Sequence, residues 1–179
     1  TTPRLLKAVV LQPNVDPYNE KFAYDASNEA FADSLINLAN RHVTAQTNLV
    51  LAPETALPLS FLEDRLHTFS FGQTITQQII KWPKANLLIG ASTVKLFDHK
   101  NSVASAPIPG ENRWFESYNT SMLLSKGKEP KFVHKSKLVP GVETLPGFLH
   151  ILDAWFEKFG GTSGGYTPQQ DRTVLESDD

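Results

Sequence analysis

The sequence predicts an α/β fold. Short, continuous apolar runs at residues 5–11, 49–52 and 86–94 are typical of strands, and segments with apolar residues at helical spacing separate them. This alternation favours an α/β architecture over an all-β one. Hydrophobic residues make up 40% and charged residues 20% of the 179 residues, which is ordinary for a globular protein. The chain shows no internal repeat, low-complexity tract or domain boundary, so we expect a single domain over residues 1–179.

The N-terminal part predicts one strand and one long helix. Residues 5–11 are β-rich around Lys7, which predicts a buried strand. Asp25 or Ser27 can cap the following helix, which is expected to continue to about residue 45. Its core-facing residues recur at helical spacing: Phe31, Leu35, Leu38 and either Ala39 or His42.

The middle of the chain predicts a strand followed by two short helices. Residues 49–52 are expected to form the second strand. Residues 59–64 and 74–81 predict short helices with Gly72 between them, and Trp82 with the proline after it ends the second. Residues 86–94 predict the third strand, in which Gly90 marks a place where the strand backbone can approach another group closely.

The second half predicts two further strands and a helix. Residues 97–114 are expected to form a loop, after which residues 118–125 and 131–134 form strands joined by a hairpin-type turn. Apolar residues at helical spacing predict a helix over residues 149–159. Val-Leu at residues 174–175 is typical of the start of another strand.

Composition argues against several functions. The net charge of −2 offers no electrostatic basis for binding nucleic acid. No segment has the apolar length of a membrane span or the pattern of a signal peptide. With no Cys, these residues form no disulfide or zinc–thiolate site and supply no thiol nucleophile. The five His residues are scattered without ligand spacing, so we predict no metal and no cofactor.

Charged side chains occupy two places where sites are often built. Glu54 directly follows an apolar strand, at the end where open α/β sheets bind ligands, and could act as a general base. Pro140 and Pro146 predict an ordered, non-helical loop over residues 139–146. Glu143 lies in this loop, and Lys135 lies just before it. The alternatives are a helix-capping role for Glu54 and a solvated basic turn around Lys135.

Both places resemble the nitrilase, or carbon–nitrogen hydrolase, superfamily, which uses a Glu-Lys-Cys triad. Pro53-Glu54 is similar to the family's Pro-Glu pair after a strand. Residues 134–138 (His-Lys-Ser-Lys-Leu) are similar to its Tyr-x-Lys-x-His/Arg-Leu pattern, with Lys135 in the catalytic position. The resemblance extends from residue 5 to about residue 173.

Within the superfamily, this sequence most resembles one branch, the apolipoprotein N-acyltransferases. Residues 138–143 (Leu-Val-Pro-Gly-Val-Glu) are similar to its Leu-Val-Pro-Phe-Gly-Glu run. Residues 9–14, residues 118–121 (Tyr-Asn-Thr-Ser) and a glycine-bearing loop at 160–165 agree with it in order and spacing. The departures are Gly-Val in place of Phe-Gly, Val-His where an aromatic residue is common, and the absence of Cys.

The resemblance implies a nitrilase-like α-β-β-α sandwich that is incomplete at the C-terminus of this chain. It implies that Glu54 is the general base, that Lys135 stabilises an oxyanion and that Glu143 orients Lys135. Tyr118 and Asn119 would support the substrate pocket through side-chain hydrogen bonds, although an ordinary pair of strand residues is an equal alternative.

The resemblance also implies a reaction and a location. In this branch a cysteine takes an acyl chain from a phospholipid donor and passes it to the N-terminus of a diacylglyceryl-Cys lipoprotein acceptor. The enzymes are held in the bacterial inner membrane by helices outside these residues, with this domain facing the periplasm. We therefore expect a soluble part of such an enzyme that stops before its nucleophile, is inactive alone and self-associates through uncovered apolar surface.

Two other functions remain open from the sequence. The chain could be part of a soluble amidase or nitrilase that acts on a small nitrogenous substrate. It could also be a non-catalytic, nitrilase-like binding domain. Transmembrane segments in the parent gene would favour the acyltransferase, and a downstream strand that carries Cys would exclude the binding domain.

Overall fold

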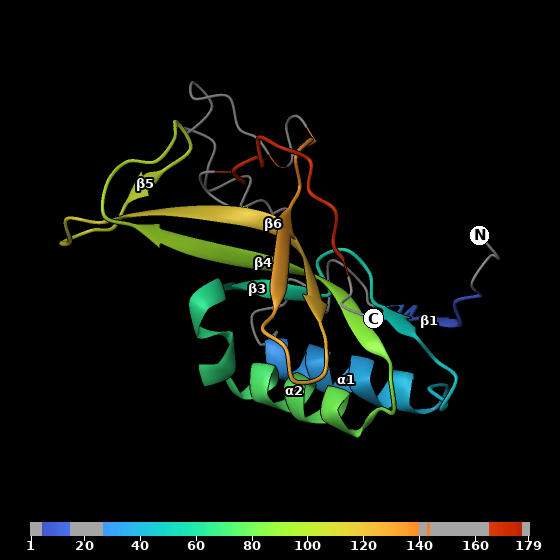
Figure 1. Ribbon diagram of the computed structural model, residues 1–179. Coiled ribbons are helices and arrows are strands. Elements are labelled where there is room, and N and C mark those ends of the chain that lie inside the picture. The colour runs from blue at the N-terminus through green and yellow to red at the C-terminus, as the bar shows by residue number, and fades with distance from the viewer. Residues whose placement is uncertain (1–4, 15–26, 140–142, 144–164, 177–179) are drawn as a thin grey trace.

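A computed structural model describes residues 5–14, 27–139, 143 and 165–176. The chain is a mixed α/β protein built on a multi-stranded sheet (Figure 1). Its elements, in chain order, are β1 (Ala8–Val10), α1 (Asn28–Asn40), β2 (Leu49–Leu51), β3 (Leu57–Leu62), the 3-10 helix η2 (Glu63–Thr68), α2 (Ser70–Lys81), β4 (Asn86–Phe97), β5 (Ala106–Pro107), β6 (Trp114–Leu124) and β7 (Lys131–His134).

The sheet has seven strands, and the strand pairing changes from parallel to antiparallel at β4. Its order is β1-β2-β4-β6-β5, with β3 also paired to β4 and β7 to β6. Strands β1, β2, β3 and β4 pair in parallel, whereas β6 is antiparallel to β4, β5 and β7. The β4–β6 pair is the longest, from Leu87 opposite Leu124 to Phe97 opposite Trp114. Within the described residues this is a single sheet, and a second sheet of the expected sandwich is not among them.

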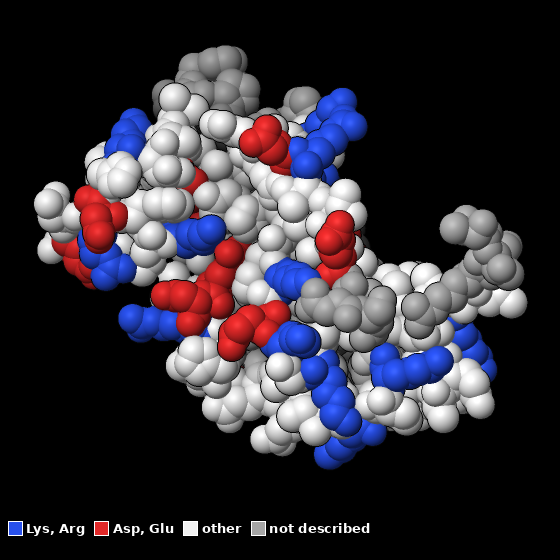
Figure 2. Space-filling model, in the orientation of Figure 1, with Lys and Arg blue, Asp and Glu red and all other residues white. Residues whose placement is uncertain are grey.

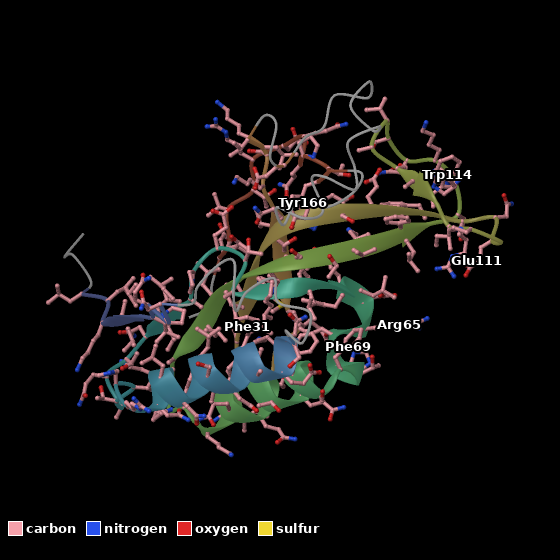
Figure 3. All side chains as sticks on the ribbon, turned by 180° about the vertical axis from the view of Figure 1, so that it is seen from behind. Phe31, Arg65, Phe69, Glu111, Trp114 and Tyr166 are labelled. Atoms are coloured by element: carbon pink, nitrogen blue, oxygen red, sulfur yellow. The ribbon has the colours of Figure 1, made fainter. Side chains whose placement is uncertain are left out.

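Helices α1 and α2 lie side by side on one face of the sheet and bury an apolar core against it (Figure 1). The helices contribute Ala32, Leu35, Ile36, Ala39, Phe71, Ile75 and Ile79. The sheet contributes Val50, Leu57, Phe61, Leu87, Ile89, Ala91, Met122 and Leu124. Phe31 and Phe69, labelled in Figure 3, pack against this core. Burying each large apolar side chain is worth roughly 1.5–3 kcal/mol, so packing rather than helix propensity holds α1 and α2 in place.

The first strand is shorter and more exposed than the sequence predicts. It covers only Ala8–Val10 and lies at one end of the strand order. Leu5, Leu6 and Val10 are therefore 95%, 67% and 73% exposed rather than buried. The expectation of a buried strand is wrong because, among the described residues, β1 pairs on one side only, with β2.

The first helix begins as predicted and ends earlier. Ser27 caps it, since its Oγ accepts a hydrogen bond from the Ala30 N–H at 3.1 Å. The alternative cap, Asp25, lies outside the described residues. The helix ends at Asn40 instead of near residue 45, so Ala39 packs in the core while His42 lies exposed beyond the helix.

The predicted helix at residues 59–64 is wrong. These residues form most of β3 and the start of η2. Leu57 pairs with Ala91 and Phe61 with Thr93, and the side chains of Leu57 and Phe61 are buried. A short apolar run fits either structure locally, and pairing with β4 decides it. The second predicted helix is found, but it begins at Ser70 and includes the glycine expected to precede it.

The strands β4 and β6 are found where predicted but are longer, and β7 has the predicted bounds. β4 continues to Phe97 and β6 begins at Trp114, so the connection between them is shorter than expected and itself contains β5. Gly127 has a φ of 69° in the turn between β6 and β7, a conformation that glycine adopts without strain. The antiparallel β6–β7 pair confirms the predicted hairpin.

The predicted helix at residues 149–159 lies outside the described residues. Residues 165–176 have no regular secondary structure, so the strand expected at residues 174–175 is not formed, and Val174 is 78% exposed. The Lys131 ammonium instead holds this segment by donating to the Glu176 carbonyl at 2.7 Å. Among the described residues, neither α1 nor α2 combines the length and apolar character needed to cross a bilayer.

Candidate active site

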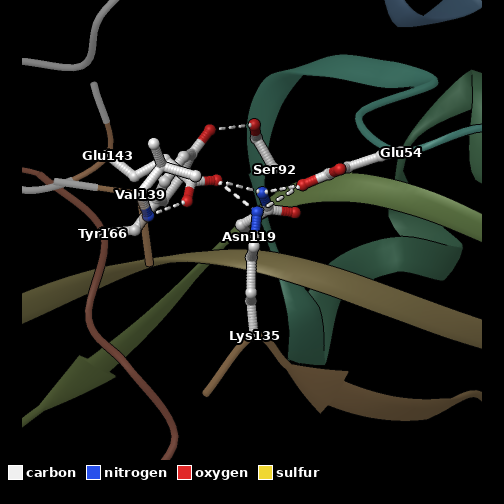
Figure 4. A network of polar contacts seen from close by, with 7 residues as sticks. All are labelled: Glu54, Ser92, Asn119, Lys135, Val139, Glu143 and Tyr166. Carbon is white, nitrogen blue, oxygen red and sulfur yellow. Dashed lines mark hydrogen bonds and ion pairs between the residues drawn. The ribbon is translucent and has the colours of Figure 1, made fainter. Parts of the chain in front are cut away.

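Glu54 is held by a tight turn that follows β2. The Gly90 N–H donates to the Pro53 carbonyl at 3.2 Å, which fastens the turn to β4. Thr55 has a φ of 52°, in the left-handed region that is strained for a β-branched residue by about 1–3 kcal/mol. The Glu54 side chain is 60% exposed and projects from this turn over the sheet (Figure 4).

Lys135 reaches the Glu54 carboxylate from the end of β7. It directly follows β7, and its N–H donates to the Asn119 carbonyl at 2.8 Å. Its Nζ lies 2.9 Å from Glu54 Oε1 and 3.0 Å from Glu143 Oε1 (Figure 4). One ammonium thus contacts two carboxylates that come from different parts of the chain.

Glu143 is the enclosed member of the group. Its side chain is 10% exposed, and its Oε2 accepts the Val139 N–H at 2.6 Å. The Asn119 side-chain amide donates to Glu143 Oε1 and to Glu54 Oε1, each at 2.7 Å. Asn119 and Lys135 therefore bridge the same two carboxylates, and we call these four residues, Glu54, Asn119, Lys135 and Glu143, the polar cluster.

These contacts favour the charged forms of the polar cluster. The hydrogen bond to Glu54 raises the pKa of Lys135 and outweighs the opposing effect of burial, with Glu143 adding to it. Burial alone would raise the pKa of Glu143, but the hydrogen bonds from Val139, Lys135 and Asn119 together lower it. At neutral pH the cluster holds an ammonium between two carboxylates.

Tyr118 does not join the polar cluster. It precedes Asn119 in β6, and successive strand residues point to opposite faces of a sheet. Its ring stacks on that of His134 with centroids 3.9 Å apart, and its hydroxyl donates to the Glu116 carboxylate. Burial, with the hydrogen bond to Glu116, raises the pKa of Tyr118. The sequence expectation that Tyr118 and Asn119 act together is thus not met: the structure places only Asn119 beside Glu54 and Lys135.

A second polar group anchors the end of β7 on the helix-covered face. His134 Nε2 lies 2.7 Å from Glu63 Oε1, and Thr93 Oγ1 donates to the same oxygen at 2.7 Å. Thr93 and Thr120 hydroxyls are 2.6 Å apart. Because His134 is fixed on one face, the next residue, Lys135, is directed to the other.

Tyr166 is a residue that sequence reasoning missed. Its hydroxyl is 2.7 Å from Ser92 Oγ, and its N–H donates to the Glu143 carbonyl at 2.9 Å. Figure 3 shows it on the opposite side of the sheet from α1 and α2. Burial raises the pKa of Tyr166. A lone Tyr in a polar, glycine-bearing stretch is the only local signal, and it does not reveal the partner on β4.

The polar cluster borders an open cavity of about 540 Å³, to which Glu54, Asn119 and Lys135 contribute. A larger cavity of about 740 Å³ lies between η2, α2 and the β6–β7 turn and contains no member of the cluster. We place the candidate site at the cavity of about 540 Å³, because the charged side chains of the polar cluster converge there. On the face shown in Figure 2, acidic and basic side chains are interspersed rather than gathered by sign.

This arrangement contains the groups needed for acid–base catalysis at a carbonyl carbon: a carboxylate that can exchange a proton and an ammonium that can stabilise an oxyanion. An exposed carboxylate, Glu54, can exchange a proton with a group in the cavity. A fixed ammonium, Lys135, can face an oxygen that becomes negative. Glu143 and Glu54 compensate the charge of that ammonium, and Asn119 bridges the two carboxylates.

Comparison with protein families finds no match, and neither does comparison with curated proteins. Among solved structures, a glutamine-dependent NAD+ synthetase from Acinetobacter baumannii, in complex with ADP, is similar at 14% sequence identity and a TM-score of 0.44. The alignment covers 85% of this chain and 23% of that one. A similarity of this degree does not assign the chain to a family.

Proposed function

We propose that the polar cluster is the acid–base part of an acyl-transfer site of the carbon–nitrogen hydrolase type. The observation that carries the proposal is the position of Lys135 Nζ, 2.9 Å from Glu54 and 3.0 Å from Glu143. The motif resemblance of Pro53-Glu54 and of the run around Lys135 supports it, because these motifs name the same residues that converge in space.

The proposed reaction uses a thiol, which none of the 179 residues supplies. Glu54 takes the thiol proton, and the thiolate attacks the carbonyl carbon of an ester. Lys135 faces the oxyanion that forms. When the oxyanion collapses, the ester C–O bond breaks and the leaving alkoxide receives the proton from Glu54, which leaves an acyl thioester. An amine then attacks the thioester, Glu54 takes the amine proton, and the thiolate leaves and is reprotonated.

The specific proposal is apolipoprotein N-acyltransferase chemistry. The acyl donor is a phospholipid, and the acceptor is the N-terminal amine of a diacylglyceryl-Cys lipoprotein. Residues 138–143 support this branch, since their Leu-Val-Pro start and closing Glu resemble its motif. The same proposal includes a nitrilase-like α-β-β-α sandwich and a location at the bacterial inner membrane, with this domain facing the periplasm.

Trapping of the acyl-enzyme tests the proposal. The full product of the gene and this 179-residue chain are each incubated with a phospholipid donor and weighed by intact mass spectrometry. We expect the full product to gain one acyl mass, removable by hydroxylamine, and this chain to gain none. The Lys135→Met variant of the full product should gain the acyl mass far more slowly.

Other outcomes distinguish the alternatives. Release of ammonia from a small amide, with no adduct from phospholipid, would replace the proposal by an amidase. A full product without an adduct or hydrolysis would identify a non-catalytic domain. A stoichiometric adduct on this chain, at Ser136 for example, would show that the nucleophile is not a thiol.

A further inference from the structure

Two basic side chains beside the polar cluster have no partner in the described part of the chain. Lys137 and Arg172 line the same cavity of about 540 Å³ as Glu54 and Lys135. Among the described residues, neither makes a hydrogen bond or an ion pair, and both are exposed. Lys135 already neutralises much of the charge of Glu54, so the part of the cavity lined by Lys137 and Arg172 carries two positive charges that no described residue pairs with.

Gln169 ties the segment that carries Arg172 to the end of β7, shortly before Lys137 in the sequence. Its side-chain carbonyl accepts the His134 N–H at 2.8 Å, at the end of β7. Its side-chain amide donates to the Asp171 carbonyl and to Thr173 Oγ1, the latter at 2.7 Å. The two residues that flank Arg172 are thus tied to the strand that leads to Lys135 and Lys137. The Gln169 N–H also donates to the Lys135 carbonyl at 3.2 Å, so one residue joins both segments twice.

The lining of this end suits a phosphate. Arg172 offers a planar fork of N–H donors and Lys137 a compact charge, and such pairs bind phosphate oxygens well. Ser121 and Ser136 also line this cavity and offer hydroxyl groups. A phosphodiester shares its charge between two free oxygens and has two weaker ester oxygens, all arranged tetrahedrally, so it can accept from donors in several directions, whereas a carboxylate has two oxygens in one plane.

We propose that Lys137 and Arg172 form a subsite for a phosphate ester, beside the position where the acyl carbonyl reacts. This deepens the proposed function and rests on it for the link to acyl transfer. The phosphate would be that of the acyl donor, bound at one end of the cavity while its ester faces Glu54 and Lys135 at the other. The subsite selects donors that carry a phosphate and fixes which ester reaches the polar cluster.

Binding can be measured without catalysis, so the test uses this chain. Backbone amide signals are followed by NMR while inorganic phosphate, acetate, dihexanoyl-phosphatidylglycerol or dihexanoylglycerol is added. We expect the two phosphate compounds to shift signals at residues 135–137 and 172, and the other two to leave them unchanged. A tighter Kd for dihexanoyl-phosphatidylglycerol than for phosphate supports a lipid source, and equal Kd values support a smaller phosphate ester.

Charge-neutral variants assign the subsite. Lys137→Gln and Arg172→Gln should each raise the Kd about tenfold or more, as expected for loss of one charge-assisted hydrogen bond. Lys84→Gln, at an exposed lysine between α2 and β4, is the matched control and should leave the Kd unchanged. Arg172→Lys should restore part of the affinity, and the amide spectrum of each variant shows whether it is folded.

The proposal is overturned if both Gln variants bind phosphate like the wild type, or if acetate binds as tightly as phosphate. Failure of the proposed reaction gives a different pattern. Phosphate would then bind through Lys137 and Arg172 while the full gene product forms no acyl-enzyme. Acyl transfer that continues with unchanged KM in both Gln variants would remove the subsite and leave the reaction in place.

Discussion

The backbone of Gly90 lies directly against that of Glu54: a Cβ atom at position 90 would be 2.6 Å from the Glu54 Cα. The same Cβ would be 2.6 Å from the Pro53 carbonyl oxygen and from the Thr55 nitrogen. The turn that holds the carboxylate of Glu54 therefore depends on a strand position without a side chain. This agrees with the sequence prediction of a close backbone approach at Gly90.

The Gly90→Ala variant should lose both stability and activity. Its methyl group has only backbone atoms to displace, and such overpacking costs about 1–3 kcal/mol. The shift moves Glu54 away from Lys135, so acyl transfer by the full gene product should fall as well. Thermal unfolding and turnover measure the two effects. Gln77→Ala, at an exposed position of α2, is the stability control, and an unchanged Tm for Gly90→Ala would contradict the geometry.

Lys135 should be the most sensitive position for turnover. Lys135→Met removes the ammonium that faces the oxyanion, and loss of such a donor costs about 10²–10³ in kcat. Lys128→Met, at an exposed lysine in the β6–β7 turn, should leave kcat unchanged. Turnover of the full gene product with a phospholipid donor is the measurement. Near-normal kcat in Lys135→Met would remove Lys135 from the proposed mechanism.

The contribution of Glu143 to stability should depend on pH in one direction. Its pKa is lowered in the folded state, in which burial is outweighed by the hydrogen bonds from Val139, Lys135 and Asn119. The stabilisation is therefore present above the unfolded pKa of about 4.3 and lost as pH falls through the lower folded value. The difference in Tm between the wild type and Glu143→Gln should be full at pH 7 and shrink in acid.

The matched control for this pH dependence is Glu111→Gln. Glu111 pairs with Arg113 at 3.8 Å, with side chains 52% and 40% exposed, and surface pairs of this kind contribute little. The Tm of the Glu111→Gln variant should stay close to that of the wild type between about pH 3 and pH 8, because a surface pair contributes only roughly 0–1 kcal/mol. If Glu143→Gln showed a Tm difference that grew toward acid pH, the assigned direction of the pKa shift would be wrong.

Neighbouring residues of β6 should separate stability from activity. Asn119→Leu removes the amide that bridges Glu54 and Glu143, so turnover should fall. Tyr118→Phe keeps the stacking on His134 but removes the hydrogen bond to the buried Glu116 carboxylate, at a cost of about 1.5–3 kcal/mol. Urea unfolding should detect that loss while kcat stays near the wild-type value. A reduced kcat in a folded Tyr118→Phe variant would restore the substrate-binding role that the sequence suggested.

Self-association should involve the outer edge of β1. Val10 in β1 and Leu5 and Leu6 just before it are largely exposed, and an apolar strand edge invites pairing with a second copy. We expect dimers of this chain at high concentration by light scattering, and fewer after Val10→Lys. A monomer at all concentrations would contradict this expectation.

Much of the sheet follows from the sequence because its strands are marked locally. β2 is the apolar run Leu-Val-Leu, β7 has Phe-Val at its centre, and each is followed by a polar or proline-bearing segment, so local pattern and final structure agree. Glu54, Lys135 and Glu143 could be grouped because each stands at a strand end or in a proline-fixed loop. The motif resemblance predicts the same grouping.

The errors arise where distant contacts decide. Residues 59–64 have no periodicity that excludes a helix, and only their pairing with β4 makes most of them a strand. The pair Tyr118-Asn119 is adjacent in the motif, yet the two-residue period of a strand sends the side chains to opposite faces. Tyr166 meets Ser92 across 74 positions of sequence, which no local signal encodes.

The long separations within the polar cluster have a consequence for how the protein is made. Lys135 and Glu54 are 81 positions apart, so at about 5–20 residues per second the ribosome adds the lysine roughly 4–16 s after the glutamate. During that interval Lys135 is not yet present to pair with Glu54, and the closure of a loop of this size must precede the pairing. The segment that carries Tyr166 and Gln169 emerges later still. The acid–base chemistry therefore belongs to the completed fold, and a nascent chain that has ended at β6 carries a carboxylate but no site.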